Sequence, residues 1–190
     1  MVKSISKKII NSISTNDNYS KDQLEQMEYI LVSILFETIK LFSVIVIFSL
    51  FGYFDKIIII LAVMSMTKIF IGGYHEDTQV KCFIATVLLA IGILVLNSQC
   101  TLSFVGNCIL IILSIFCLWH QVPIINPKMP ITRQELINKN RIRGLSIATI
   151  LGITSICLYN FSNYYSLITW TILFNTILMF NKKMLNVLKY

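Results

Sequence analysis

The sequence predicts an all-α membrane protein with six transmembrane helices and both termini in the cytoplasm, preceded by a short amphipathic N-terminal helix. The chain of 190 residues is 56% hydrophobic and only 13% charged, with a mean hydropathy of +0.76. Soluble domains are about one quarter charged. Apolar runs recur along the chain after residue 28, and basic residues gather in alternate connections between them. We therefore expect residues 1–190 to form a single transmembrane domain in the cell membrane.

Residues 1–28 form a polar leader before the first apolar run. Isoleucines at positions 5, 9, 10 and 13 have helical spacing with lysines between them, which is typical of a helix lying on the membrane surface. A disordered basic leader is an equal alternative. No cleavable signal peptide is visible, so the first span is expected to act as the targeting signal. Ser20–Gln23 (SKDQ) has the pattern of a capping box and predicts a helix start.

Six apolar runs predict the spans. Several are shorter than the roughly 20 residues that cross a bilayer, so we expect flanking residues to extend them. The runs cover residues 30–54, 57–71, 82–97, 102–122, 145–161 and 164–180.

The connections between the spans differ in charge, and the difference predicts the topology. Residues 98–101 and 160–163 carry no charge, and Asp55 and Lys56 cancel. The predicted 123–143 loop is basic, and so is the C-terminal tail. Basic loops favour the cytoplasm, and six spans with cytoplasmic ends put all basic segments, with the 68–81 turn, on that side. The basic residues are Lys128, Arg133, Lys139, Arg141 and Arg143 in the loop, and Lys182, Lys183 and Lys189 in the tail.

The stretch KIFIGGYHEDTQVKC, residues 68–82, concentrates reactive groups between apolar runs. The pair Gly72-Gly73 predicts a sharp turn. His75 and Cys82 are seven residues apart, which is about 10.5 Å along one straight helix. A loop that folds back could bring them together. A thiol near a helix start, with a histidine as base, is the minimum set for nucleophilic acyl transfer.

A structural interpretation competes with this catalytic one. A histidine at a membrane edge often contacts headgroups, and a cysteine in an apolar span is usually a small hydrophobic residue. Glu76 or Asp77 could orient the histidine, or could cap the third span instead. The five cysteines form no CxxC motif, so neither a disulfide framework nor a zinc site is expected. We expect no metal and no cofactor. We also expect no nucleic-acid partner, because the basic residues flank apolar spans and are not interleaved with exposed aromatic residues.

Glu37 and Lys40 are ionisable residues inside the first predicted span, and they support a different class of function. Ionisable groups at that depth are costly and often functional. They could line the pathway of a small transporter or channel, or they could simply pair at a spacing of three residues. A structural or signalling partner without chemistry is a third class.

The arrangement of these residues resembles the accessory gene regulator B (AgrB) family. The resemblance rests on GGYH followed by Cys82, on the two apolar spans before it, and on the later PIINPKMPIT segment, residues 123–132. It covers nearly the whole chain. The family comprises multi-pass membrane cysteine endopeptidases that process the precursor of a cyclic quorum-sensing peptide.

The resemblance implies roles for individual residues and a partner. Cys82 would be the nucleophile and His75 the general base, supported by Gly72, Gly73 and Lys68. The family typically has arginine at the position of Lys68; lysine keeps the charge but loses bidentate hydrogen bonding. The resemblance also implies an AgrD-like propeptide as substrate, a homodimer, an active site on the cytoplasmic side, and closure of a thiolactone or lactone ring through a thioester.

Overall fold

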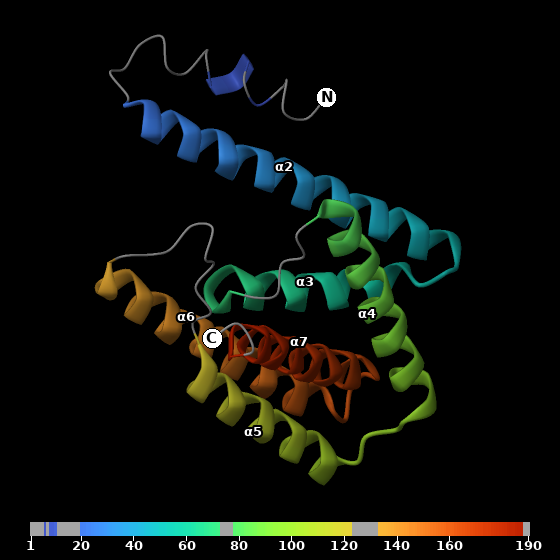
Figure 1. Cartoon of the computed structure of the whole chain (residues 1–190). Coiled ribbons are helices and arrows are strands. Elements are labelled where there is room, and N and C mark those ends of the chain that lie inside the picture. Colours follow the sequence, from blue (N-terminus) through green and yellow to red (C-terminus); the bar gives the residue numbers. More distant parts are fainter. Residues whose placement is uncertain (1–5, 7, 11–19, 73–77, 123–132, 188–190) are drawn as a thin grey trace. The chain divides into compact units, whose positions relative to one another are not determined.

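The computed structural model describes residues 6, 8–10, 20–72, 78–122 and 133–187, and every regular element in these ranges is an α-helix (Figure 1). The chain forms two compact units, Met1–Phe51 and Gly52–Tyr190, which are described separately. The all-helical fold class is therefore confirmed for the described residues. Residues 6 and 8–10 are helical, and the rest of the predicted N-terminal amphipathic helix lies outside the described ranges.

The first unit contains one long helix, α2, which spans Lys21–Leu50. The predicted capping box is confirmed: the Gln23 N–H donates to Ser20 Oγ at 3.3 Å, and the Ser20 N–H donates to Gln23 Oε1 at 2.9 Å. The prediction that this span continues to residue 54 is wrong. The helix ends at Leu50, and Gly52 has a φ of 78°, a backbone conformation that glycine adopts at little cost.

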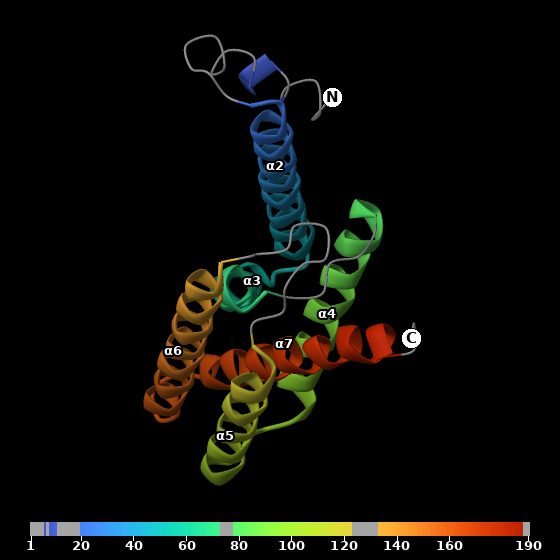
Figure 2. The same cartoon turned by 60° about the vertical axis from the view of Figure 1, so that its left-hand side comes forward.

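The part of the second unit that the structure describes contains five helices, and α7 lies in their middle (Figures 1 and 2). Helix α7 contacts each of the other four, while α3 also contacts α4 and α6, and α5 also contacts α6. The helices are α3 (Phe54–Ile71), α4 (Gln79–Gln99), α5 (Phe104–Gln121), α6 (Gln134–Leu158) and α7 (Tyr164–Val187).

Helix α6 starts earlier than the predicted fifth span. The predicted basic loop of residues 123–143 is therefore wrong in its second half, because α6 begins at Gln134. This polar first part contains a Glu135–Lys139 ion pair of 2.9 Å at the favourable i, i+4 spacing. A search for apolar residues alone misses such a helix start.

Four helices in the described residues are long and apolar enough to cross a membrane: α2 from Gln23, α4, α5 and α6. Helix α7 contains a shorter apolar stretch, Tyr164–Phe180. Helix α3 is 18 residues long and includes Asp55, Lys56 and Lys68. The membrane class is thus supported by four spans of adequate length, and α3 and α7 are not among these four.

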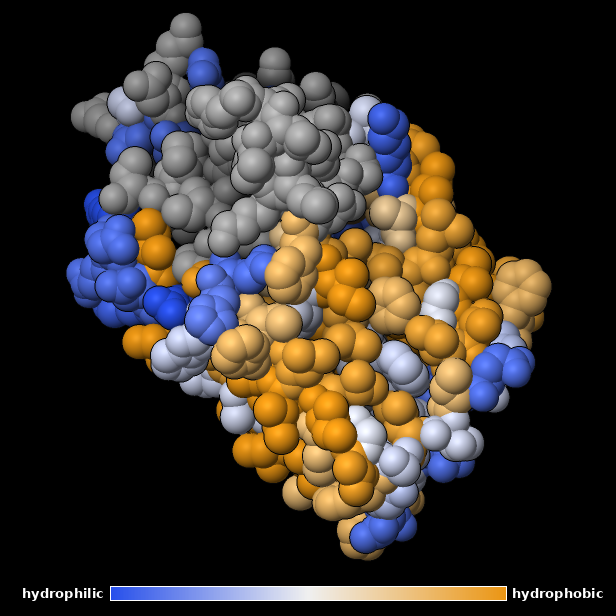
Figure 3. All heavy atoms as spheres, turned by 60° about the horizontal axis from the view of Figure 1, so that its bottom comes forward, coloured by the Kyte–Doolittle hydropathy of each residue, from blue (hydrophilic) through white to orange (hydrophobic). Residues whose placement is uncertain are grey.

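The surface of the second unit is apolar to a degree that water would not favour. Ile109, Ile112 and Phe116 on α5 are 58%, 67% and 61% exposed. The face seen in Figure 3 is largely hydrophobic, with hydrophilic residues at its margins. Extensive exposed apolar area marks an interaction surface, and lipid chains are the environment that matches helices of this length.

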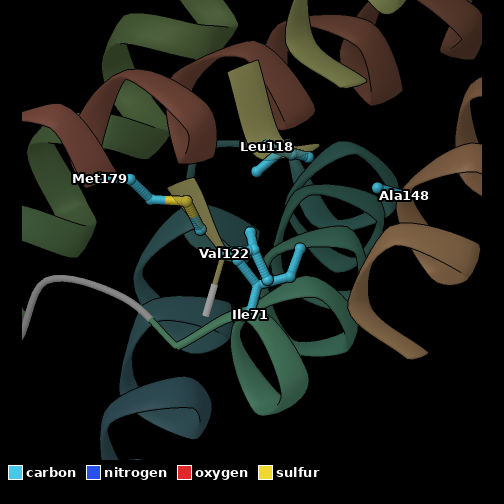
Figure 4. Close-up of a cluster of buried hydrophobic side chains, with 5 residues drawn as sticks. All are labelled: Ile71, Leu118, Val122, Ala148 and Met179. Carbon is cyan, nitrogen blue, oxygen red and sulfur yellow. The ribbon is translucent and has the colours of Figure 1, made fainter. Parts of the chain in front are cut away.

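Apolar side chains from four helices, α3, α5, α6 and α7, meet in a buried cluster. Ile71 at the end of α3, Leu118 and Val122 at the end of α5, Ala148 near the middle of α6 and Met179 in α7 pack together (Figure 4). The end of α3 and the end of α5 therefore lie at the same end of the unit. We call this the Ile71 end. The opposite end contains the start of α3, the end of α4 and the start of α7.

Small residues let α6 approach its neighbours closely. Gly144, Ala148, Gly152 and Ser155 are buried along one face of the helix. A Cβ atom at Gly144 would lie 2.5 Å from Ile71 Cγ1, and one at Gly152 would lie 2.6 Å from Ile111 Cγ2. Membrane helices often pack through small residues four apart, because without a hydrophobic driving force they depend on close van der Waals contact.

A buried polar network joins α5, α6 and α7. Thr169 Oγ1 donates to Asn107 Oδ1 at 2.6 Å, and Asn107 Nδ2 donates to Ser155 Oγ at 3.2 Å. Ser155 Oγ also lies 2.8 Å from Thr169 Oγ1 and 2.9 Å from the Tyr165 carbonyl. Each side chain satisfies the others, so the network fixes the relative rotation of three helices.

Candidate active site

The segment that leads to Cys82 starts at Gly72, whose backbone conformation ends α3. Gly72 has φ 76° and ψ −173°, and its N–H donates to the Lys68 carbonyl at 3.0 Å. Residues with a Cβ atom rarely adopt these angles, so glycine is required for the turn in this form. The predicted break is confirmed at Gly72. Gly73 lies outside the described residues.

Thr78 is the N-cap of α4. It is extended, with φ −120° and ψ 147°, and its hydroxyl accepts from the Lys81 N–H at 3.4 Å. The N-cap residue is therefore Thr78 rather than Glu76 or Asp77. Both acids lie outside the described residues, so their part in orienting the histidine stays a prediction.

Cys82 lies in the first turn of α4 and is half-buried. Its N–H donates to the Thr78 carbonyl at 3.1 Å, and its carbonyl accepts from the Thr86 hydroxyl at 2.9 Å. The positive end of the helix dipole acts over this turn. The backbone of the candidate nucleophile is thus held in a regular helix, one turn from the helix start.

His75 lies outside the described residues, so its contact with Cys82 stays a prediction. The start of α4 at Gln79, after an extended Thr78, means that this helix does not extend back to position 75. The single straight helix that would hold the two residues about 10.5 Å apart therefore does not form. His75 lies three positions before Thr78, and a chain of three residue steps spans at most about 11 Å. A chain that turns back over the helix start can bring the imidazole to the thiol.

Arginines of α6 bind the helix ends next to the turn. Arg141 Nη2 donates to the Trp119 carbonyl at 3.0 Å, and its Cζ atom lies 5.3 Å from the centre of the Trp119 ring. Arg143 Cζ lies 6.0 Å from the centre of the Phe70 ring, two residues before Gly72. A cation at a helix C-terminus interacts favourably with the last carbonyl groups. These two arginines therefore have a structural role at the Ile71 end.

Glu37 and Lys40 form an ion pair on α2, as the spacing predicted. The Lys40 side chain is 11% exposed and that of Glu37 is 43% exposed. Among the described residues, no group of three or more His, Cys, Asp or Glu side chains is placed to hold a metal ion.

Sequence reasoning missed three structural features of the second unit. Gly144, Ala148 and Gly152 are spaced by four, which is a readable signal for close helix packing once α6 is recognised. Asn107 is a polar residue within an apolar run and could have been predicted to seek a partner on another helix. The partner of Arg141 has no sequence signal, because it is a backbone carbonyl on another helix.

Together, these features define a multi-helix membrane protein with a cysteine in the first helical turn after a glycine-dependent break. The family model for accessory gene regulator B matches residues 6–179. The chain belongs to the accessory gene regulator B family. AgrB-like protein 1 of Clostridium perfringens strain 13 is 38% identical over 176 residues, covering 93% of this chain and 94% of the relative. AgrB-like proteins of strains SM101 and 13 are 25% and 22% identical over 84% of this chain and 79% of each relative. No solved structure matches the chain.

Proposed function

We propose that the protein is a membrane cysteine endopeptidase that removes the C-terminal tail of an AgrD-like propeptide and prepares it for cyclisation. Membership of the AgrB family implies processing of an autoinducing-peptide precursor. The observation that carries the enzymatic proposal is the position of Cys82, in the first turn of α4 and ten residues after the break at Gly72. A nucleophile on a regular helix has a well-defined position, and the preceding segment can present a base to it.

The proposed reaction starts when Cys82 Sγ attacks a peptide carbonyl of the precursor. His75 takes the thiol proton and gives it to the leaving amine, so that the carbon–nitrogen bond breaks and the tail departs with a free amino group. The rest of the peptide remains attached to Cys82 as a thioester. A cysteine or serine of the peptide then attacks this thioester, which releases Cys82 and closes a thiolactone or lactone. Exchange between two thioesters is nearly balanced, so closure of a thiolactone requires no nucleotide.

Exclusion of water is required for ring closure, because water would otherwise hydrolyse the thioester. Cys82 is half-buried, and the next residue along the chain is the half-buried Phe83. An apolar setting for the thioester is consistent with this local environment. The peptide nucleophile, which is already bound beside the thioester, then has the advantage of proximity over water.

Cations at the Ile71 end suit a substrate with an acidic tail. Lys68 belongs to the last turn of α3, and Arg133 and Lys139 are exposed at and near the start of α6. Opposite charge would attract a negatively charged tail to this end. The same basic residues favour a cytoplasmic position, so we place the reaction on the cytoplasmic side. A homodimer is part of the proposal, as the family resemblance implies.

The transporter or channel alternative rests on ionisable groups within the spans. In α2 these groups, Glu37 and Lys40, form an ion pair with each other. Mutual pairing accounts for both charges, so no observation specifically favours a transport pathway.

Replacement of Cys82 tests the proposed function. Cys82→Ala, co-expressed with the propeptide in a host that has no related system, should abolish cleavage while the protein still inserts into the membrane. Cys108→Ala is the matched control, because Cys108 is also a half-buried cysteine in an apolar helix, α5. Mass spectrometry of the propeptide reports the result. Normal processing by the Cys82→Ala protein would exclude the proposed mechanism.

A further inference from the structure

A pocket opens in the second unit at the end opposite Ile71. Its volume is about 560 Å³, and its walls come from the start of α3, the end of α4 and the start of α7. Pockets of several hundred Å³ are the size that binds small molecules and lipid headgroups. The polar lining residues that matter here are Lys56, Asn97, Thr101, Ser162, Asn163 and Tyr164.

Hydrogen bonds between elements hold the pocket walls together. Ser166 Oγ donates to Asn97 Oδ1, which joins α7 to α4, and it lies 3.1 Å from the Asn163 carbonyl. The Tyr165 hydroxyl donates to the Leu102 carbonyl at 2.7 Å, which joins α7 to the segment before α5. Ser166 is buried. The pocket is therefore part of the packed structure rather than a gap between exposed side chains.

The polar lining of the pocket offers several hydrogen-bond donors. Among the described residues that line it, Lys56 is the one charged residue and none is a carboxylate. Asn97 uses its side-chain oxygen to accept from Ser166, which leaves its amino group as a donor for a ligand. Ser162 Oγ accepts from the Tyr164 N–H at 3.3 Å, which leaves its hydroxyl hydrogen to donate.

We propose that this pocket binds a phosphate group carried by a small ester, either a phospholipid headgroup or a soluble phosphate ester. Phosphate oxygens are acceptors only, and they match a pocket lined by a lysine together with amide and hydroxyl side chains. The pocket lies where helices end, and the ends of membrane helices lie at the level of the headgroups. This site is at the opposite end of the unit from the Gly72 break, so it is separate from the proposed reaction.

Cys100 lines the same pocket and is exposed, so it can report on occupancy. The full-length protein in dodecyl maltoside micelles is alkylated with N-ethylmaleimide, and the rate at Cys100 is followed by peptide mass spectrometry. Phosphatidylglycerol, glycerol phosphate or neutral diacylglycerol is added in increasing amounts. We expect a phosphate-bearing compound to slow alkylation of Cys100 saturably. The rate at the exposed Cys157, which does not line the pocket, should not change.

Two substitutions identify the groups that bind phosphate. Lys56→Gln should raise the half-protecting concentration about tenfold, as expected for loss of one charge-assisted contact. Asn97→Asp keeps an oxygen that can accept from Ser166 but replaces the donor with a negative charge, so it should abolish protection. Lys139→Gln, which alters an exposed lysine of α6 outside the pocket, is the matched control and should leave protection unchanged.

The three added compounds distinguish the sources of phosphate. Protection by phosphatidylglycerol alone would assign the pocket to a lipid headgroup, and protection by glycerol phosphate would assign it to a soluble ester. Absence of saturable protection by both compounds would overturn the proposal. Equal protection by diacylglycerol, or equal protection of the wild-type and Lys56→Gln proteins, would overturn it as well. If Asn97→Asp does not fold, the Lys56→Gln comparison still decides the result.

Discussion

Two glycines at the Ile71 end have unrelated physical roles. Gly72 supplies backbone angles that other residues avoid, whereas Gly144 supplies space. Ile71 is next to both glycines: it directly precedes Gly72 in sequence, and it contacts Gly144 across the helix interface. A substitution at either glycine should therefore alter the conformation at the start of the segment that leads to Cys82, although neither glycine reacts with the substrate.

Gly144→Ala should destabilise the protein by about 1–3 kcal/mol, because the new methyl group would overlap Ile71 and overpacking has costs of that order. Thermal unfolding in detergent measures the change. Gly92→Ala is the control, since a Cβ atom there would meet Phe174 at an ordinary 4.0 Å. Adding Ile71→Ala to Gly144→Ala should recover part of the loss. Strict additivity of the two substitutions would contradict the proposed contact.

Gly72→Ala should reduce propeptide cleavage more than it reduces membrane insertion. The substitution introduces a Cβ atom at φ 76° and ψ −173°, where backbone strain is of the order of 1–3 kcal/mol. Relief of this strain would alter the path of the chain towards His75. Cleavage assays with Gly72→Ala and Gly92→Ala measure the difference. Equal activity of the two variants would show that the conformation of Gly72 is irrelevant to the reaction.

At the scale of helices, the pattern of apolar residues predicted which helices exist better than it predicted where each helix begins and ends. Helices α4 and α5 have bounds close to the predicted spans 82–97 and 102–122. The start of α6 was missed because its first turns are polar, and the end of α2 was missed because Gly52 sits among apolar residues. Interhelical pairs such as Asn107 with Ser155 could not be predicted, since they depend on the relative rotation of helices far apart in sequence.

Asn107→Ala should lower stability by about 1–2 kcal/mol, because Ser155 and Thr169 each lose a buried partner. Denaturation in a detergent series measures the loss. Ser114→Ala is the matched control: Ser114 is buried on the same helix, but its hydroxyl donates to the Leu110 carbonyl of its own helix rather than to another helix among the described residues. If both variants lose equal stability, the network between helices contributes nothing beyond a local hydrogen bond.

At the scale of the whole molecule, the second unit has two chemically different ends. The Ile71 end has Gly72, the arginines of α6 and the chain that leads to Cys82, whereas the other end has the donor-rich pocket. Sequence reasoning identified the candidate nucleophile and the break before it. Whether His75 contacts Cys82 stays a prediction, because the conformation of the segment between them depends on packing against the rest of the protein.

Membrane sidedness should follow these two ends. In intact cells an impermeant thiol reagent should label Cys100, at the pocket end, from outside. An added cysteine in place of Arg133, before α6, should react only after the membrane is permeabilised. Mass spectrometry of labelled peptides provides the readout. Labelling of the Arg133→Cys protein in intact cells would reverse the proposed topology and place the reaction outside the cell.

We expect the chain after Gly72 to bring His75 to Cys82, so that the imidazole removes the thiol proton. The most direct measurement is the rate of alkylation at Cys82 at neutral pH, compared with the rate at the half-buried Cys108 of the same molecule. We predict that Cys82 reacts faster than Cys108, and that His75→Ala slows Cys82 while leaving Cys108 unchanged. Equal rates at the two cysteines, or a Cys82 rate that does not respond to His75→Ala, would contradict the account.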